Sequence, residues 1–128
     1  MKKFTGVIIA ESLDDASLLD QVKIVSTRVS EVTEKHKTPW LKKWTLHTVE
    51  VERSRVEEIS KALSEHIDQR HSHSWYVDYD DGEVHYIIFP HKIFRIDMKS
   101  ETQYAEAKKY GVDLGIPPYQ VDFHPKER

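Results

Sequence analysis

The sequence predicts an α+β fold, a ferredoxin-like (split βαβ) antiparallel sheet that is extended by a β-meander and a C-terminal helix. Apolar residues recur along the chain with two alternating periods, two residues in strands and three to four in helices. The resulting order of strand, short helix, strand, strand, helix and strand is that of the split βαβ unit. No internal repeat or linker rich in Pro, Gly or Ser interrupts it, so residues 1–128 are predicted to form a single domain.

Four segments form the first half of this fold. Residues 4–10 (FTGVIIA) are rich in β-branched side chains and are short, which favours a buried strand. Residues 12–21 carry early acidic residues and three apolar positions, enough for a short helix only. Residues 22–32 alternate as a strand does. After a basic connection that contains Pro39, residues 44–51 (WTLHTVEV) form the next strand.

Two longer helices are indicated by their capping patterns. Ser54 stands three residues before Glu57, a capping box in which each side chain bonds the other residue's amide. The apolar stripe that follows, through about residue 69, consists of Val56, Ile59, Leu63 and Ile67. The second helix begins with the same pattern, from Ser100 to Gln103. We expect it to end at Gly111, because glycine adopts the left-handed closing conformation without cost.

Residues 74–89 (SWYVDYDDGEVHYIIF) predict a β-hairpin. Asp81-Gly82 is a strong two-residue turn signal, because the matching turn needs positive φ at both central positions. Counting outward from this turn places Asp78 directly opposite His85 and separates the side chains into two faces. One face carries Trp75, Val77, Tyr79, Val84, Tyr86 and Ile88, and the other carries Tyr76, Asp78, His85, Ile87 and Phe89.

A second turn is predicted at residues 89–92 (FPHK), where proline pre-sets φ for the first central position. It brings residues 92–97 (KIFRID) into the sheet as a third strand, with Arg95 beside Tyr86. Both faces of this meander are largely apolar. We therefore expect a sheet that is covered on both sides, or one face that lines a pocket.

Asp78 and His85 are the candidate catalytic residues. A carboxylate beside an imidazole favours its charged form and fixes its tautomer, as a general base or a metal ligand requires. The alternative is a solvated cross-strand pair near the hairpin tip, which is the commoner situation. The candidate ligand-binding residues around the pair are Tyr76, Ile87, Tyr86 and Arg95.

Metal and cofactor chemistry is narrowly limited. The sequence has no cysteine, which excludes disulfides, thiolate nucleophiles and cysteine-built metal sites. His71 and His73 offer two imidazoles on one side of an extended segment as a candidate metal site, but no third ligand is evident, and the simpler interpretation is a polar connection. No glycine-rich phosphate loop and no G-x-S-x-G turn is present, so no cofactor is predicted.

Charge and hydropathy set expectations about partners. With 19 basic and 22 acidic residues, the net charge of −3 disfavours a general polyanion binder. Residues 35–44 (KHKTPWLKKW) interleave lysines with tryptophans, as single-stranded nucleic-acid binding requires, but the tryptophans equally suit one end of the core. No apolar run suits a signal peptide or a membrane span, so we expect a cytoplasmic protein without a membrane partner.

An open sheet edge, or the aromatic tail with Tyr119 and Phe123, predicts a homo-oligomer, a dimer in the simplest case. Taken together, these features favour a small-ligand-binding or protein-interaction module. One alternative is a small enzyme that uses the Asp78–His85 pair. The other is a weak single-stranded nucleic-acid binder that uses residues 35–44.

Overall fold

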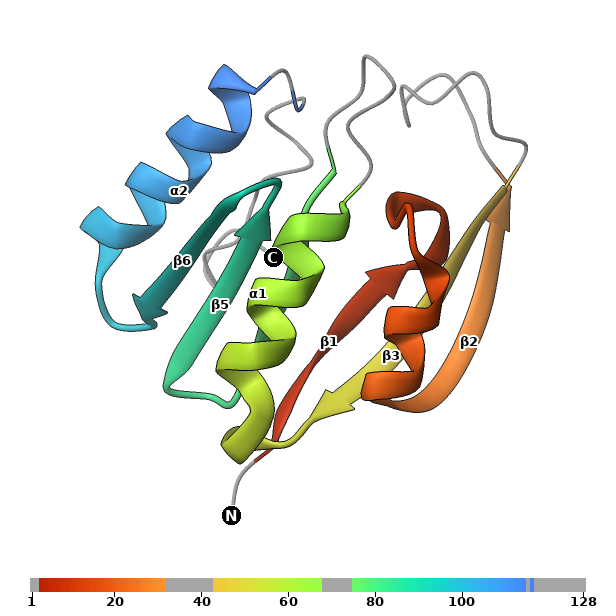
Figure 1. Cartoon of the computed structure of the whole chain (residues 1–128). Helices are drawn as coiled ribbons and strands as arrows, with labels where there is room; N and C mark the ends of the chain where they lie inside the picture. The colour runs from red at the N-terminus through yellow and green to blue at the C-terminus, as the bar shows by residue number, and fades with distance from the viewer. Residues whose placement is uncertain (1–2, 32–42, 68–74, 115, 117–128) are drawn as a thin grey trace.

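The computed structural model describes residues 3–31, 43–67, 75–114 and 116. Within these ranges the chain forms a six-stranded antiparallel open sheet and two α-helices, so the mixed α+β class is confirmed (Figure 1). The strands are β1 (Phe4–Ile9), β2 (Lys23–Glu31), β3 (Lys43–Val51), β4 (Val77–Asp80), β5 (Val84–Phe89) and β6 (Lys92–Asp97). The α-helices are α1 (Val56–His66) and α2 (Glu101–Asp113).

The strand order in the sheet is β2-β3-β1-β4-β5-β6, and each pair of neighbours is antiparallel. The short helix predicted over residues 12–21 is present as two 3₁₀ segments, η1 (Ala10–Ser12) and η2 (Ala16–Gln21). A further 3₁₀ segment, η4 (Arg53–Arg55), leads into α1.

The strand order places β2 at one edge of the sheet and β6 at the other.

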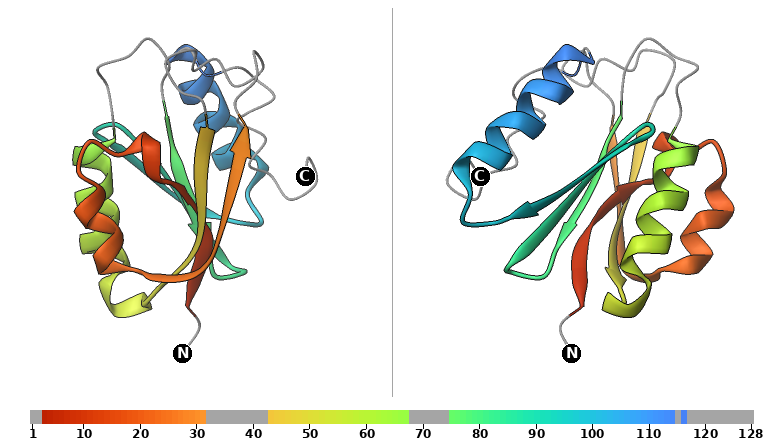
Figure 2. Two further views of the ribbon diagram at one scale, coloured as in Figure 1. Left: turned by 90° about the vertical axis from the view of Figure 1, so that its right-hand side faces the viewer. Right: turned by 60° about the vertical axis from the view of Figure 1, so that its left-hand side comes forward.

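The two α-helices cover opposite faces of the sheet, as Figure 2 shows. The α1-side core contains Phe4, Ile8, Val49, Ile59, Leu63, Tyr79, Tyr86 and Ile88, among others. The α2-side core contains Ile87, Phe89, Ile96, Tyr104, Ala107 and Ile116. Since successive side chains of β5 alternate between these two cores, β5 is buried on both faces, and the predicted division of the hairpin into two faces is confirmed.

The predicted register of the hairpin was wrong by two residues. Asp78 lies opposite Ile87, and His85 lies opposite Asp80. A shift of two residues preserves the alternation of side chains, so every residue keeps its predicted face although its partner changes.

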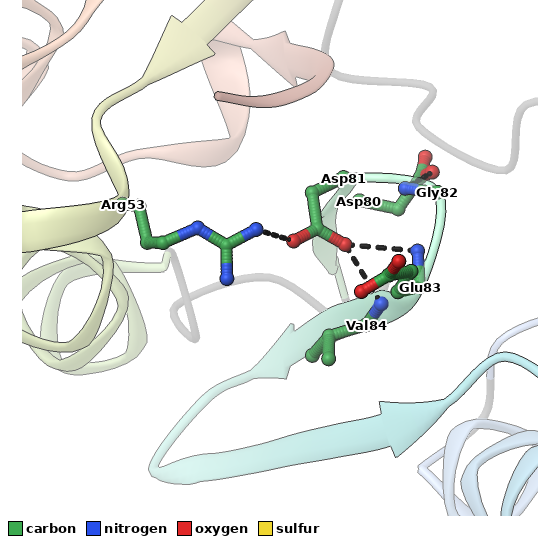
Figure 3. Close-up of polar contacts among 6 residues, drawn as sticks. All are labelled: Arg53, Asp80, Asp81, Gly82, Glu83 and Val84. Carbon is green, nitrogen blue, oxygen red and sulfur yellow. Dashed lines mark hydrogen bonds and ion pairs between the residues drawn. The ribbon is translucent and has the colours of Figure 1, made fainter. Parts of the chain in front are cut away.

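The cause of the shift is the side chain of Asp81. Its carboxylate accepts hydrogen bonds from the amides of Glu83 and Val84, at 2.9 and 2.8 Å (Figure 3). The Asp81 amide in turn donates to the Val84 carbonyl. Asp81 therefore flanks the loop, whose central residues are Gly82, with a φ of +93°, and Glu83.

The second turn and the pairing of β6 agree with the sequence. Phe89 lies opposite Lys92, and Arg95 lies opposite Tyr86. His91, at the second central position, has a φ of +56°, as a type II turn requires. Its amide donates to the Ser64 carbonyl of α1, which ties this turn to the helix.

The caps of the helices differ from the prediction at two points. The capping box at Ser54 was wrong, because η4 carries the chain into α1, whose N-cap, Arg55, has no side-chain cap bond. The Ser100 cap is confirmed, since its hydroxyl accepts from the Gln103 amide at 3.2 Å. Gly111 does not end α2. The helix continues to Asp113, and Gly111 is buried within it.

Candidate functional site

Asp78 and His85 are hydrogen-bonded although they do not lie directly opposite each other. His85 Nε2 and Asp78 Oδ2 are 2.7 Å apart. Asp78 comes from β4 and His85 from β5, where the two residues are diagonal neighbours on the α2 side of the sheet. The structure therefore brings the predicted pair together by a geometry different from the predicted one.

Tyr104 of α2 completes this polar cluster. Its hydroxyl lies 2.9 Å from His85 Nδ1, so both ring nitrogens of the histidine have a protein partner. The side chain of His85 is 2% exposed and that of Asp78 is 17% exposed. His85 is thus buried, and Asp78 is half-buried beside it.

This arrangement limits what His85 can do chemically. A general base or a metal ligand needs one ring nitrogen that faces the substrate or the ion. Here one nitrogen contacts the sheet's own aspartate and the other contacts the helix that covers this face. The geometry favours a positioning role, in which His85 joins α2 to the sheet.

The four candidate ligand-binding residues do not line one cavity. Tyr76 and Ile87 lie on the α2 side, where the Tyr76 ring packs 6.1 Å from that of Phe89. Tyr86 lies on the opposite face, buried against Phe4. Arg95 is exposed on β6 beside Tyr86.

Cavities between residues that the structure describes include two on the α1 side. The larger, about 260 Å³, lies between η2 and α1 and is lined by Leu18, Gln21, Arg55, Glu58, Ile59, Ala62 and Leu63. The smaller, about 90 Å³, shares Gln21, Arg55 and Ile59 with it and adds the charged side chains of Lys3, Lys23, Glu50 and Glu52. Neither of these two cavities is lined by Asp78 or His85.

A second polar cluster holds the tip of the hairpin. Arg53, in η4, donates to the Asp81 carboxylate (Figure 3). Its guanidinium also lies over the ring of Phe4, 5.7 Å from the ring centroid. Burial alone would raise the pKa of Asp81, but the bonds from the Val84 and Glu83 amides and the charge of Arg53 outweigh it and hold that pKa below its usual value. This cluster fixes the turn and has no substrate-facing group.

The most open element of the described chain is the edge strand β2. Eight of its nine residues are exposed. Ile24, Val25 and Val29 are 42%, 54% and 57% exposed, the three highest values among the large hydrophobic side chains of the described residues. A register shift between Ile24 and Ser26 marks a β-bulge in its pairing with β3. Alternation over residues 22–32 indicated the strand, but the sequence did not distinguish an edge from a central position.

Several predicted sites fall outside the described residues. These are the His71 and His73 pair, most of the lysine and tryptophan segment at residues 35–44, and the tail with Tyr119 and Phe123. Trp44, which is described, packs its ring 5.1 Å from that of Trp75, as its core interpretation predicts. Among the described residues, no group of three or more His, Asp and Glu side chains could hold a metal ion.

Comparisons with protein-family models, with curated proteins and with solved structures gave no match. In the described ranges, neither helix is long and apolar enough to span a membrane. The cytoplasmic location stays a prediction. Function must therefore be argued from the geometry of the chain itself.

Proposed function

We propose that this protein is a protein-interaction module that binds a strand of another polypeptide along the open edge of β2. The observation that carries the proposal is the exposure of β2, in which eight of nine residues are exposed and three of these are aliphatic. In the described part of the chain, β2 pairs with β3 alone. Its outer side therefore offers backbone N–H and C=O groups to an added strand.

Strand addition draws affinity from these main-chain hydrogen bonds and specificity from alternate side chains. Lys23, Arg28 and the bulge after Ile24 are features that hinder indiscriminate pairing of edges. The exposed valines act in the opposite direction, because they offer apolar area to a matching strand. An edge that combines both kinds of feature should pair with a matching strand and should reject most others.

The competing functions have weaker support. Ligand sites usually occupy about 300–1,000 Å³, and the two α1-side cavities described above, of about 260 and 90 Å³, fall below that range. His85 has both ring nitrogens engaged, which does not favour an enzyme built on Asp78 and His85. Small-ligand binding in the larger cavity is the second candidate, because its lining combines apolar side chains with the charged Arg55 and Glu58 and would suit an amphipathic molecule.

Two finer predictions remain proposals. The order β2-β3-β1-β4, with antiparallel neighbours and with α1 between β3 and β4 in sequence, supports a ferredoxin-like unit, to which β5, β6 and α2 are added. A cytoplasmic location is consistent with a sequence without cysteine.

The test is a selection of extended peptides from a displayed random library against the immobilised full chain. Selected peptides should bind with amide chemical-shift changes centred on residues 23–31. Val29→Lys should weaken the binding of these peptides at least about tenfold, because it replaces an exposed aliphatic side chain of β2 with a charged one. Ile93→Lys, the matched change at an exposed aliphatic residue of the other edge strand, should leave binding unchanged. Peptides that bind both variants equally would contradict the proposal.

A further inference from the structure

We infer that the partner of β2 is a second copy of this chain, and that the two β2 strands pair antiparallel about a two-fold axis at Thr27. This inference rests on the proposed function and names its partner. It follows from the spacing of exposed side chains along the strand. A two-fold axis makes an interface self-complementary, so the strand must match its own reverse.

The strand does match its own reverse at Thr27. Val25 and Val29 stand two residues before and two residues after Thr27. An axis at Thr27 therefore places Val25 beside Val29 of the partner subunit, and the symmetry repeats this contact. Val25 is the extra residue of the bulge and has no partner in β3, so the regular part of the pairing covers residues 26–28. Since these two side chains are 54% and 57% exposed, pairing would cover the most exposed aliphatic residues of the described chain.

The polar residues are compatible with the same register. Ser26 lies opposite Arg28 of the partner subunit, so no two like charges are directly opposed. Each end of the strand pair carries Lys23 from one copy and Glu31 from the other. The bulge after Ile24 places these two charges on different faces, so they add a screened attraction rather than a salt bridge.

Neighbouring registers fit less well. An axis at Arg28 opposes the Arg28 side chains of the two copies and pairs Val29 with Thr27 of the partner subunit. An axis at Ser26 opposes Val25 to Thr27 of the partner subunit and Val29 to Lys23 of the partner subunit, so no valine meets a valine. Of these three registers, the axis at Thr27 alone joins valine to valine without opposing like charges.

The assembly is also closed. Each copy uses its β2 edge once, so the dimer is a continuous twelve-stranded sheet whose outer edges are the two β6 strands. On β6, both α1 and α2 pack against the strand, and Ile96 is buried. The β2 edge is exposed and free to pair, whereas the β6 edge is packed against both helices, so pairing through β2 stops at two copies.

Single-cysteine variants test the register directly, because the natural sequence contains no cysteine. Opposed residues of antiparallel strands have Cα atoms about 4.5–5.5 Å apart, within the range that a disulfide spans. Thr27→Cys should therefore give a covalent dimer under oxidised glutathione, which accepts the two electrons and two protons of the thiols. Ser26→Cys is the control, since its two copies lie about 8 Å apart across the axis.

Mixing two single-cysteine variants gives a second test of the register. Val25→Cys and Val29→Cys should each cross-link poorly alone and should cross-link to each other when mixed. The accompanying measurement is sedimentation velocity of the unmodified chain from about 1 to 200 μM, in which the 15.1 kDa species should convert to one of twice that mass. Val29→Lys should raise the dissociation constant at least about tenfold, and Ile93→Lys should not change it.

The outcomes separate this inference from the function on which it rests. A chain that stays monomeric, with no Thr27→Cys dimer, overturns the self-association, whereas peptides that depend on Val29 would still support strand addition. A dimer that cross-links through Ser26→Cys and not through Thr27→Cys overturns the register. A dimer insensitive to Val29→Lys overturns the use of β2 in self-association.

Discussion

β5 and β2 belong to the same sheet and have opposite environments. β5 lies between α1 and α2, and five of its six residues are buried. β2 lies at the edge, and eight of its nine residues are exposed. Both strands contain β-branched residues, so local preference for extended structure does not separate them. Their position relative to the helices does.

The contrast shows where stability and association are located. In β5, each side chain has neighbours on its face of the sheet, and substitutions there should disrupt the fold. In β2, the side chains face outward, and substitutions should leave the fold intact while changing what the edge can bind. Four predictions test this division, from the largest expected effect to the smallest.

Phe89→Ala should have the largest effect. The Phe89 ring is fully buried and packs against the rings of Tyr76, Phe94 and Tyr110. Its removal should lower the free energy of unfolding by about 3–5 kcal/mol, because it leaves a cavity among rigid aromatic side chains. Urea unfolding followed by circular dichroism measures this. A loss below about 1 kcal/mol would show that β5 is not central to the core.

His85→Phe should cost about 2–3 kcal/mol, since it removes the bonds of the ring to Asp78 and Tyr104 inside the protein. Tyr104→Phe is the matched control. It keeps the Asp78 bond and should cost about 1 kcal/mol. Diethyl pyrocarbonate should also modify His66, which is 40% exposed on its side chain, well before His85. Equal reactivity of the two histidines would mean that His85 is open to solvent.

Asp81→Asn should destabilise the protein by about 1–2 kcal/mol at pH 7, because it removes the charge that Arg53 and two amides stabilise. The pKa of Asp81 is lowered in the folded state, so its stabilisation is complete above the unfolded value and is lost as the pH falls through the lower, folded value. The difference between wild type and variant should therefore shrink below about pH 4. A difference that is constant from pH 7 to pH 2 would show that the charge has no role.

Substitutions in β2 should have the smallest effect on the fold. Val25→Thr and Val29→Thr should each change the free energy of unfolding of the monomer by less than about 0.5 kcal/mol, since both side chains are more than half exposed. Chemical denaturation at a protein concentration below the dissociation constant measures the monomer alone. A loss comparable with that of Phe89→Ala would remove the distinction between the two strands.

The sequence predicted the faces of the meander better than its register. Faces depend on alternation, which Val77, Tyr79, Tyr86 and Ile88 display without reference to any partner. Register depends on which residues form the turn, and Asp81-Gly82 is a strong signal for one choice. The Asp81 side chain instead accepts hydrogen bonds from the amides of Glu83 and Val84, which moves the turn one residue along the chain. The Asp-Gly turn rule considers only backbone angles and does not include such side-chain bonds.

The candidate site was predictable in part. The nearness of Asp78 and His85 follows from two short strands joined by a turn, and it survives the register shift because diagonal neighbours can still bond. The third member, Tyr104, comes from a helix 19 residues further along the chain. Its contact depends on how α2 packs, which local patterns do not specify. The same holds for Arg53, whose partner lies 28 residues away.

The unequal size of the two cores bears on hydrogen exchange. Among described residues, the α1-side core has fourteen buried hydrophobic members and the α2-side core has six. Local opening costs less where fewer buried contacts are lost, so we expect α2 to detach before the sheet unfolds and the amides of α2 to exchange ahead of those in β1. During such an opening His85 would lose its Tyr104 partner and its Nδ1 would meet solvent. We therefore expect a residue that is closed in the folded state to react in a brief, partly unfolded one.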